Sequence, residues 1–474
     1  MTGNSFDKRN FLFFLNKIYP PKFEDSLIGA FLRPSTWNAV ARMVSTARRK
    51  NVFVQSVNKA LLYVHVPFCG RLCTFCHCEK ILLRRHSDID VYIKALTRQM
   101  MVLAPIYKGM NTSLICFGGG TPSILNERHL TAILDGGDKA FPARDRKILF
   151  EANPSSWTAS KLALLSSRGL YRLSIGVESL EEKVLKLVSR SQTKKKVLWC
   201  LHSARKAKVP HVNVDLIAGL PGQTIKGFIN DLEFVINEGA NIVHVYPYCK
   251  SSMKGLCGPG ESFPMFFKRR DCMMKAAALI LQGAGFRRKG LEAYTRNGEG
   301  DEDQEEVYLR LGAAVAAIGP SVLGQIPGAA FYRMGQVGST ADFTGVDACV
   351  QDVDYVMSHY AIFALMSELD EKLFFQRFGV TLDQHCGEGL RYLQQSGLVV
   401  FSRGIWKYFG EWEIRRIHEF VALSRVLFGE KILFRLRSRY IKEYDPRQDY
   451  SEGNALFMAY GNTWVMNLYY QMGH

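Results

Sequence analysis

Four cysteines occur within ten residues of this chain, in the stretch "CGRLCTFCHC". Cys69, Cys73 and Cys76 form a Cys-x3-Cys-x2-Cys triplet, and Cys78 follows two positions later. Thiols grouped in this way can form disulfides, bind zinc, act as a redox pair or hold an iron–sulfur cluster. The spacing and the rest of the sequence have to decide among these four chemistries.

The spacing favours an iron–sulfur cluster. Structural zinc sites usually take two separated ligand pairs, and no second pair follows here, although Cys78 or His77 could complete a zinc tetrahedron. A redox pair would use Cys73 and Cys76 and leave Cys69 without a role. Three thiolates at this spacing can instead hold three corners of a [4Fe–4S] cube, whose fourth iron is then open to S-adenosylmethionine (SAM). An electron from such a cluster can cleave the sulfonium of SAM and release a 5′-deoxyadenosyl radical.

Composition favours a cytoplasmic protein with reduced thiols. The 474 residues include eleven cysteines, an odd number, with only one dense group. The short apolar run in "NFLFFLNKIYPPKF" is interrupted by Lys17 and two prolines, and no stretch reaches the roughly 20 apolar residues of a membrane span. We therefore expect no membrane association and a cysteine group that binds metal.

The formal net charge of +17 indicates an anionic partner, which could be a polycarboxylate substrate, an acidic electron carrier or nucleic acid. A hydrophobic content of 47% is enough for a large core. Charge and composition alone do not rank these partners.

Short apolar runs alternate with helix-like segments, which predicts parallel βα units. Six such units suggest a partial (β/α)6 TIM-like barrel, an α/β fold, at residues 59–290. We expect an N-terminal extension at 1–58, a connecting segment on the substrate side at 291–350, and a mainly helical, winged-helix-like domain at 351–474. The six predicted strands are 61–66, 113–119, 147–152, 171–177, 212–219 and 241–247.

Polar or glycine-rich groups mark the end of each predicted strand, where parallel barrels carry their active sites. They are Cys69, "GGGTP" (118–122), Glu151, Glu178, Asp215 and "YPYCK" (246–250).

Several motifs resemble one known family. "YVHVPFC", "LCTFCHC", "GGGTPS", "EANP", "LSIGVES" and "NVDLIAGLPGQT" occur in that order between residues 63 and 224. They are similar to motifs of the oxygen-independent coproporphyrinogen III dehydrogenase (oxidase) family, within the radical SAM superfamily. The resemblance implies an enzyme with the partial barrel, a [4Fe–4S] cluster and one or two SAM molecules.

The resemblance also implies roles for the cysteines and for two aromatic residues. Cys69, Cys73 and Cys76 would ligate the cluster, and Cys78 matches an extra cysteine of the dehydrogenases that is not a ligand. Tyr63 and Phe75 resemble residues near the cluster and the adenine. The sequence identifies no residue that attacks the substrate.

Other residues resemble the SAM-binding set of the family. Gly119, Gly120 and Thr121 match a loop that contacts the methionine amino group, and Glu151 matches a residue of the SAM site. Arg190 resembles an arginine that meets the methionine carboxylate. Asp215 resembles an acid that binds the ribose hydroxyls, and Glu178 takes a position beside the ribose that is usually glutamine. His65 is expected to be a packed histidine.

The substrate half departs from the dehydrogenases. Their Arg-Tyr-Thr-Ser-Tyr-Pro segment has no counterpart in "NKIYPPKFEDSLIG", and of the segment linked to substrate only "IGPSVLG" remains. This pattern resembles family members that transfer a methyl or methylene group to an sp2 carbon of a small aromatic molecule, by methylation or cyclopropanation. The alternative is coproporphyrinogen III oxidation, because four propionates would suit the positive charge.

Two further classes remain open as alternatives. A haem chaperone of the family would lack the cysteine that matches Cys78, and an RNA-modifying enzyme would carry an RNA-binding module that is not recognisable here. We expect a small anionic or aromatic substrate and a low-potential electron donor such as flavodoxin or ferredoxin, and we do not expect nucleic acid.

Overall fold

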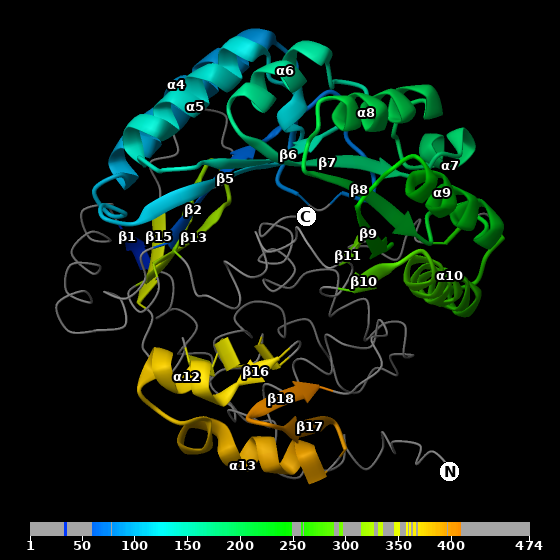
Figure 1. Ribbon diagram of the computed structural model, residues 1–474. Helices are drawn as coiled ribbons and strands as arrows, with labels where there is room; N and C mark the ends of the chain where they lie inside the picture. The colour runs from blue at the N-terminus through cyan, green and yellow to red at the C-terminus, as the bar shows by residue number, and fades with distance from the viewer. Residues whose placement is uncertain are drawn as a thin grey trace.

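A curved parallel sheet forms the centre of the computed structural model (Figure 1). Six strands lie side by side in the order β2–β5–β6–β7–β8–β9, all parallel. They confirm the six predicted strands, with ends that differ by at most two residues. The strands are β2 (Lys59–Val66), β5 (Asn111–Gly119), β6 (Lys147–Ala152), β7 (Leu170–Glu178), β8 (His211–Ala218) and β9 (Ile242–Pro247).

The structure describes residues 33–35, 59–76, 78–248, 257–258, 260–288, 293–296, 314–326, 330–334, 346–350, 357–358, 360–361, 364–365, 368–395 and 397–408. Of the predicted N-terminal extension, only the strand β1 (Arg33–Ser35) falls within these ranges. The predicted domain boundaries therefore stay predictions.

Helices cover the outer side of the curved sheet, as Figure 1 shows for α4, α5, α6, α8 and α9. The side chains of Asn126, Thr158, Thr193 and Thr224 accept a backbone N–H in the first turns of α5, α6, α8 and α9, which explains where these helices begin. The helices are α4 (His86–Leu103), α5 (Glu127–Ala140), α6 (Ala159–Ser167), α7 (Glu182–Leu187), α8 (Lys194–Lys206), α9 (Ile225–Asn237) and α10 (Phe263–Gly283), with a 3-10 turn η2 (Pro122–Ile124).

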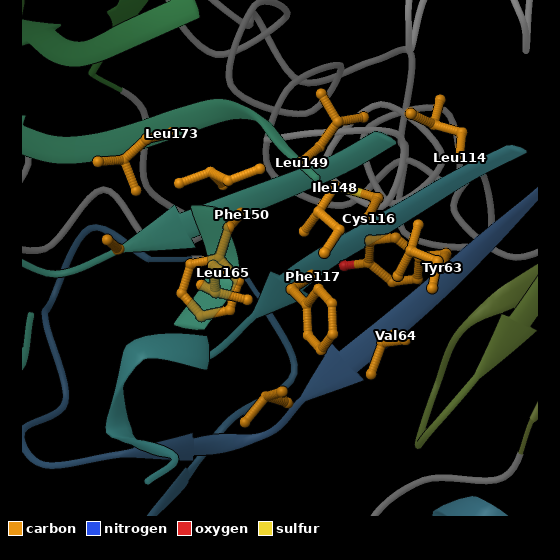
Figure 2. Close-up of a cluster of buried hydrophobic side chains, with 14 of the residues drawn as sticks. Tyr63, Val64, Leu114, Cys116, Phe117, Ile148, Leu149, Phe150, Leu165 and Leu173 are labelled. Carbon is orange, nitrogen blue, oxygen red and sulfur yellow. The ribbon is translucent and has the colours of Figure 1, made fainter. Parts of the chain in front are cut away.

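The two faces of the parallel strands carry different side chains, because successive residues of a strand point to opposite faces. On the outer face, Phe117 of β5 packs against Phe150 of β6 at 5.3 Å between ring centroids (Figure 2). Phe150 also packs against Trp157, at 5.5 Å between ring centroids. The inner face carries Tyr63 and Glu151 instead. The outer face is therefore a core beneath the helices, and polar groups gather on the inner face.

The sheet continues beyond the six predicted strands to thirteen. β12 (Ala314–Ile318) lies parallel to β2, and β13 (Leu323–Ile326), β14 (Ala330–Met334), β15 (Val346–Val350) and β1 follow antiparallel. At the other edge, β11 (Ala293–Arg296) and β10 (Phe286–Arg288) add to β9. The sequence did not indicate these strands, since β12 reads "AVAAI" and alanine is a poor strand former.

Residues 369–408 form a small unit with its own core around Phe374, Leu390 and Trp406. It combines two helices with a three-stranded sheet in the order β16–β18–β17, which has the helices and the hairpin expected of a winged-helix-like unit. Its elements are β16 (Leu369–Asp370), α12 (Glu371–Phe378), α13 (Leu382–Gln395), β17 (Val399–Ser402) and β18 (Ile405–Tyr408).

Candidate active site

The cysteine loop joins two very short parallel strands, β3 (Phe68–Cys69) and β4 (Ile81–Leu82). Its closure is fixed by the Leu83 amide, which donates to the Cys69 carbonyl at 2.9 Å. The Thr74 amide donates to the carbonyl of Val188, behind α7, at 3.1 Å. The loop is therefore held both at its base and against the neighbouring β7–α7 connection.

Lys80 holds the second half of this loop by hydrogen bonds to its backbone. Its ammonium donates to the carbonyl of Cys76 at 2.6 Å and to the carbonyl of Cys78 at 3.2 Å. One cation thus holds the backbone on both sides of position 77, which lies outside the described residues. No sequence pattern indicates Lys80, because a lysine two residues beyond a cysteine group has no distinctive spacing.

Each thiol of the triplet has a different polar neighbour. The Thr121 hydroxyl donates to Cys69 Sγ at 3.4 Å, and Arg190 Nη1 lies 3.9 Å from Cys73 Sγ. The Cys78 thiol hydrogen-bonds to Cys76 and, with Lys80, lowers the pKa of Cys76 to about 6. Burial raises the pKa of Cys69 to about 11. None of Cys69, Cys73, Cys76 and Cys78 forms a disulfide within the described part of the chain.

The donor set fits a cluster with several irons. Three thiols, those of Cys69, Cys73 and Cys76, lie in one loop, and thiolates are the ligands that iron–sulfur clusters take from proteins. A [4Fe–4S] cube offers each thiolate its own iron, so the three thiols need not converge on one point. The zinc alternative that uses His77 lies outside the described residues.

Glycines let the chain pass close to the inner face beside this loop. At Gly119, φ is +105°, and a Cβ would lie 2.7 Å from the His65 ring. At Gly118, a Cβ would lie 2.8 Å from the Tyr63 hydroxyl and 2.9 Å from Glu151 Oε1. The structure therefore brings Tyr63 and Glu151 together over this segment. His65 is buried and bonds the Glu79 carbonyl at 2.8 Å, as expected for a packed histidine.

Two carboxyl groups of the inner face are held in conditions that disfavour their charge. Burial, reinforced by the nearby charge of Asp215, raises the pKa of Glu151 to about 8. Burial also raises the pKa of Glu178 to about 7, although Arg190 acts in the opposite direction. A cationic ligand would relieve both effects, because it favours the ionised carboxylates.

Glu178 ends β7 at a break in the strand register. Gly176 is paired with Asp215 of β8, the pairing shifts by one residue, and Glu178 has a left-handed φ of 63°. Such a bulge redirects a side chain that regular alternation would place elsewhere. It brings Glu178 Oε1 to 3.4 Å from Arg190 Nη2.

Arg190 is oriented by several acceptors. Its Nε donates to Gln192 Oε1 at 2.8 Å, and its Nη2 also bonds the Gly176 carbonyl. Gln192 in turn donates to the Val177 carbonyl. The guanidinium is therefore fixed between β7 and the cysteine loop, where it could meet a ligand carboxylate.

Asp215 lies on β8, and one of its two carboxylate oxygens contacts two neighbouring side chains. Asn213 Nδ2 donates to Asp215 Oδ1 at 2.8 Å, and His244 Nδ1 lies 3.4 Å from the same atom. Tyr246 continues this row along β9, with its hydroxyl 3.0 Å from His244 Nδ1. None of the sequence motifs indicates a role for Asn213 or His244. The only sign of them in the sequence is that each is a polar residue within a mostly apolar strand.

Phe75 packs among apolar side chains and not among the carboxylates. It is half-buried and packs in a small cluster with Val188, Ile217 and Tyr248, near Phe267 of α10. This cluster lies at the carboxyl ends of β8 and β9, which is compatible with a flat ring placed against it. Of the predicted site residues, all except Phe75 and Gly120 are thus linked to one another by contacts or charges on the inner face. Gly120 is tied to β2 instead, because its amide donates to the Val66 carbonyl at 2.7 Å.

Among the described residues, no helix has both the length and the hydropathy that crossing a bilayer requires.

Comparison with known proteins places the site in context. Residues 63–235 match the model of the Radical SAM superfamily. The chain is 35% identical over 188 residues to the oxygen-independent coproporphyrinogen III oxidase of Escherichia coli (strain K12). The aligned residues are 40% of this chain and 41% of that protein. It is 31% identical over 186 residues to the heme chaperone HemW of Bacillus subtilis (strain 168). Here the aligned residues are 39% of this chain and 49% of that protein.

The chain thus spans about two fifths to one half of the length of these curated relatives. The solved structure of coproporphyrinogen III oxidase (HemN) from Escherichia coli is similar in fold, with a TM-score of 0.70 and 21% identity. That alignment covers 83% of this chain and 93% of the other. The comparisons confirm the α/β fold, the resemblance stated from the motifs, and the cofactor class of a [4Fe–4S] cluster with SAM.

Proposed function

Residues 63–235 belong to the radical SAM superfamily, and from this premise we propose that the chain is an enzyme that cleaves SAM at the inner face of its sheet. The proposal rests on the position of the Arg190 guanidinium, which lies between a cysteine of the triplet and a carboxylate of β7. A [4Fe–4S] cluster bound there would supply the electron that cleaves the sulfonium, which generates a 5′-deoxyadenosyl radical.

The cysteines divide into ligands and a neighbour in this proposal. Cys69, Cys73 and Cys76 would hold the cluster, because their thiols sit in one loop with separate surroundings. Cys78 would stay outside the ligand set and act on Cys76 through its hydrogen bond. Lys80 would keep the loop backbone closed around the group.

The inner face would hold SAM by its charged ends. Arg190 would bind the methionine carboxylate through its planar fork. Gly119, Gly120, Thr121 and Glu151 would line the position of the methionine amino group, and the backbone amide of Gly119 already bonds the Glu151 carboxylate.

The other end of SAM would lie along β8 and β9. Asp215 would accept from the ribose hydroxyls, with Glu178 beside it. Phe75 would contact the adenine from its apolar cluster. Tyr63, next to Glu151, would lie between the cluster and the nucleoside.

Charge supports a cationic ligand at this place. SAM carries a sulfonium and an ammonium, and Glu151 and Glu178 both have raised pKa values in its absence. Binding a cation beside them would favour their ionised forms, so part of the binding free energy would come from restoring these charges.

For the finer reaction we propose methyl or methylene transfer to an sp2 carbon of a small aromatic molecule. Its support is the sequence on both sides of the predicted barrel, at residues 16–29 and beyond residue 290, which lacks most of the segments that characterise the coproporphyrinogen dehydrogenases. The second candidate is oxidation of coproporphyrinogen III, because a relative 35% identical over 188 residues carries that name. An electron donor of low potential, such as flavodoxin or ferredoxin, would serve either reaction, in a cytoplasmic setting.

The first experiment tests the cluster assignment. Anaerobic reconstitution should give about four irons per chain and absorbance near ~400 nm. Cys73→Ser should lower both, whereas Cys78→Ser should retain the iron. Cys272→Ser on α10 is the matched control, since Cys272 is exposed and its substitution should change neither. Bound zinc in place of iron would contradict the proposal.

The second experiment separates the two reactions. With reductant and SAM, the reconstituted protein should release 5′-deoxyadenosine, and methyl transfer should also form S-adenosylhomocysteine. Conversion of coproporphyrinogen III to a vinyl product, without S-adenosylhomocysteine, would support the second candidate and exclude the first.

A further inference from the structure

We propose that His244 of β9 is a positioning residue that fixes the carboxylate of Asp215 for recognition of a ribose. The inference rests on the proposed function, because it takes Asp215 as the group that meets the nucleoside. It adds a residue that none of the motifs singled out, and it predicts a measurable preference for ligands with intact ribose hydroxyls.

His244 lies at the meeting point of two strands. In the parallel pairing of β8 with β9, Asp215 stands directly opposite His244. His244 Nδ1 lies 3.4 Å from Asp215 Oδ1 and 3.4 Å from Asn213 Nδ2, and the Tyr246 hydroxyl lies 3.0 Å from the same nitrogen. One ring nitrogen is therefore shared among three polar groups.

These contacts hold Asp215 in either neutral form of the ring. With a proton on Nδ1, His244 donates to Asp215 Oδ1 directly. With the proton on Nε2, Nδ1 accepts from Tyr246 and from Asn213, whose amide also donates to Asp215 Oδ1 at 2.8 Å. In both cases the imidazole restricts the torsion of the Asp215 side chain, either itself or through Asn213.

Burial makes this restriction effective. The His244 side chain is 3% exposed and Asn213 is 1% exposed, whereas the Asp215 side chain keeps 21% exposure. The partners are thus fixed in the sheet, and the carboxylate that they hold is the member that a ligand can reach. The His244 ring also packs edge-on against Tyr246, with 5.9 Å between the ring centroids.

The geometry indicates which oxygen meets the ligand. The contacts of Asp215 with Asn213 and His244 both involve Oδ1. Oδ2 is therefore the oxygen that we expect to accept from a ribose hydroxyl. A hydrogen bond to a charged acceptor in a partly buried site depends strongly on its geometry, so loss of the imidazole should weaken this contact specifically.

The test compares two probes in the reconstituted holoprotein, S-adenosylhomocysteine and its 2′,3′-dideoxy analogue, by calorimetric titration. The variants are H244A, which removes the ring, and H244N, whose amide can replace Nδ1 as donor or acceptor. H202A is the matched control, because His202 on α8 is half-exposed and pairs with Glu238 away from the site. Cluster absorbance and the thermal midpoint monitor folding.

We expect wild type and H202A to bind S-adenosylhomocysteine at least about tenfold more tightly than the dideoxy analogue. H244A should lose most of this preference, by weaker binding of S-adenosylhomocysteine alone, and H244N should restore it. If H244A keeps the preference, or loses affinity for both probes equally, His244 is not a positioning residue, whereas the proposed function stands. A wild type that releases no 5′-deoxyadenosine and binds neither probe would overturn the proposed function and this inference together.

Discussion

Arg190 Nη2 lies 3.4 Å from Glu178 Oε1, and both side chains are only 10% exposed. The same guanidinium reaches 3.9 Å from Cys73 Sγ through Nη1. One buried ion pair thus connects the cysteine loop to the end of β7. Removal of one partner would leave the other as an uncompensated buried charge. The pair therefore holds the two side chains in position, even if it adds little net stability.

Gly176→Ala should displace this ion pair without unfolding the protein. A Cβ at position 176 would lie 2.9 Å from both Arg190 Nη2 and Glu178 Oε1, which are the ends of flexible side chains and can move. We expect SAM affinity, measured by calorimetry, to fall at least about tenfold, because the guanidinium that we propose to bind the methionine carboxylate is shifted. The thermal midpoint should change little.

Gly283→Ala at the end of α10 is the control, because nothing lies within 4 Å of its added Cβ. Unchanged SAM affinity in Gly176→Ala would show that the position of the pair does not affect binding.

Glu178→Gln should change how stability depends on pH. The pKa of Glu178 is raised from 4.5 to about 7, so between these values the folded state binds more protons at this group than the unfolded state does. Its contribution to stability is therefore present at low pH and is lost as pH rises through this window. The neutral amide has no such loss.

We expect the thermal midpoint of Glu178→Gln, taken as a difference from that of wild type, to increase as pH rises from about 4.5 to about 7. Circular dichroism would measure it. Parallel curves for the two proteins would mean that the Glu178 carboxyl titrates normally in the fold.

Lys80→Met should shorten the lifetime of the cluster. The substitution keeps the apolar stem but removes the ammonium that holds the carbonyls of Cys76 and Cys78. Loss of cluster absorbance in the presence of an iron chelator should then become several-fold faster. Arg84→Met is the matched control, because Arg84 is exposed just after β4. Equal rates in the two variants would assign the Lys80 contacts no role in retaining iron.

Asp231→Ala should destabilise the connection that follows Glu178. Asp231 of α9 is 4% exposed, and its Oδ2 accepts from the Ser179 hydroxyl at 2.7 Å and from the Leu180 amide at 3.0 Å. Without it, the buried Ser179 hydroxyl and the partly buried Leu180 amide lose their acceptor, which costs about 1–3 kcal/mol of unfolding free energy in urea titrations. Glu233→Ala, at an exposed position of the same helix, should be nearly neutral. A similarly small effect at Asp231 would contradict this account.

Local signals were enough to predict the six parallel strands and the cysteine triplet. Strands buried on both faces appear in the sequence as continuous apolar runs, such as "ILF" in β6, and glycines or polar residues mark their ends. Residues 314–318 also form a short apolar run, but three of the five are alanine, a poor strand former, so the run does not indicate a strand. Their identity depends on pairing, with Ala314–Ile318 becoming a strand because it lies beside β2.

Residue types and spacing by themselves determined the chemistry that this chain can perform: three thiols for a cluster, an arginine, and acids at the ends of parallel strands. Only the tertiary structure decided how these groups are coupled. It brought Arg190 between Cys73 and Glu178 through a bulge in β7, and it placed His244 opposite Asp215 through the register of β8 with β9. Such contacts join residues of different strands, so their geometry depends on sheet register, which no short stretch of sequence contains.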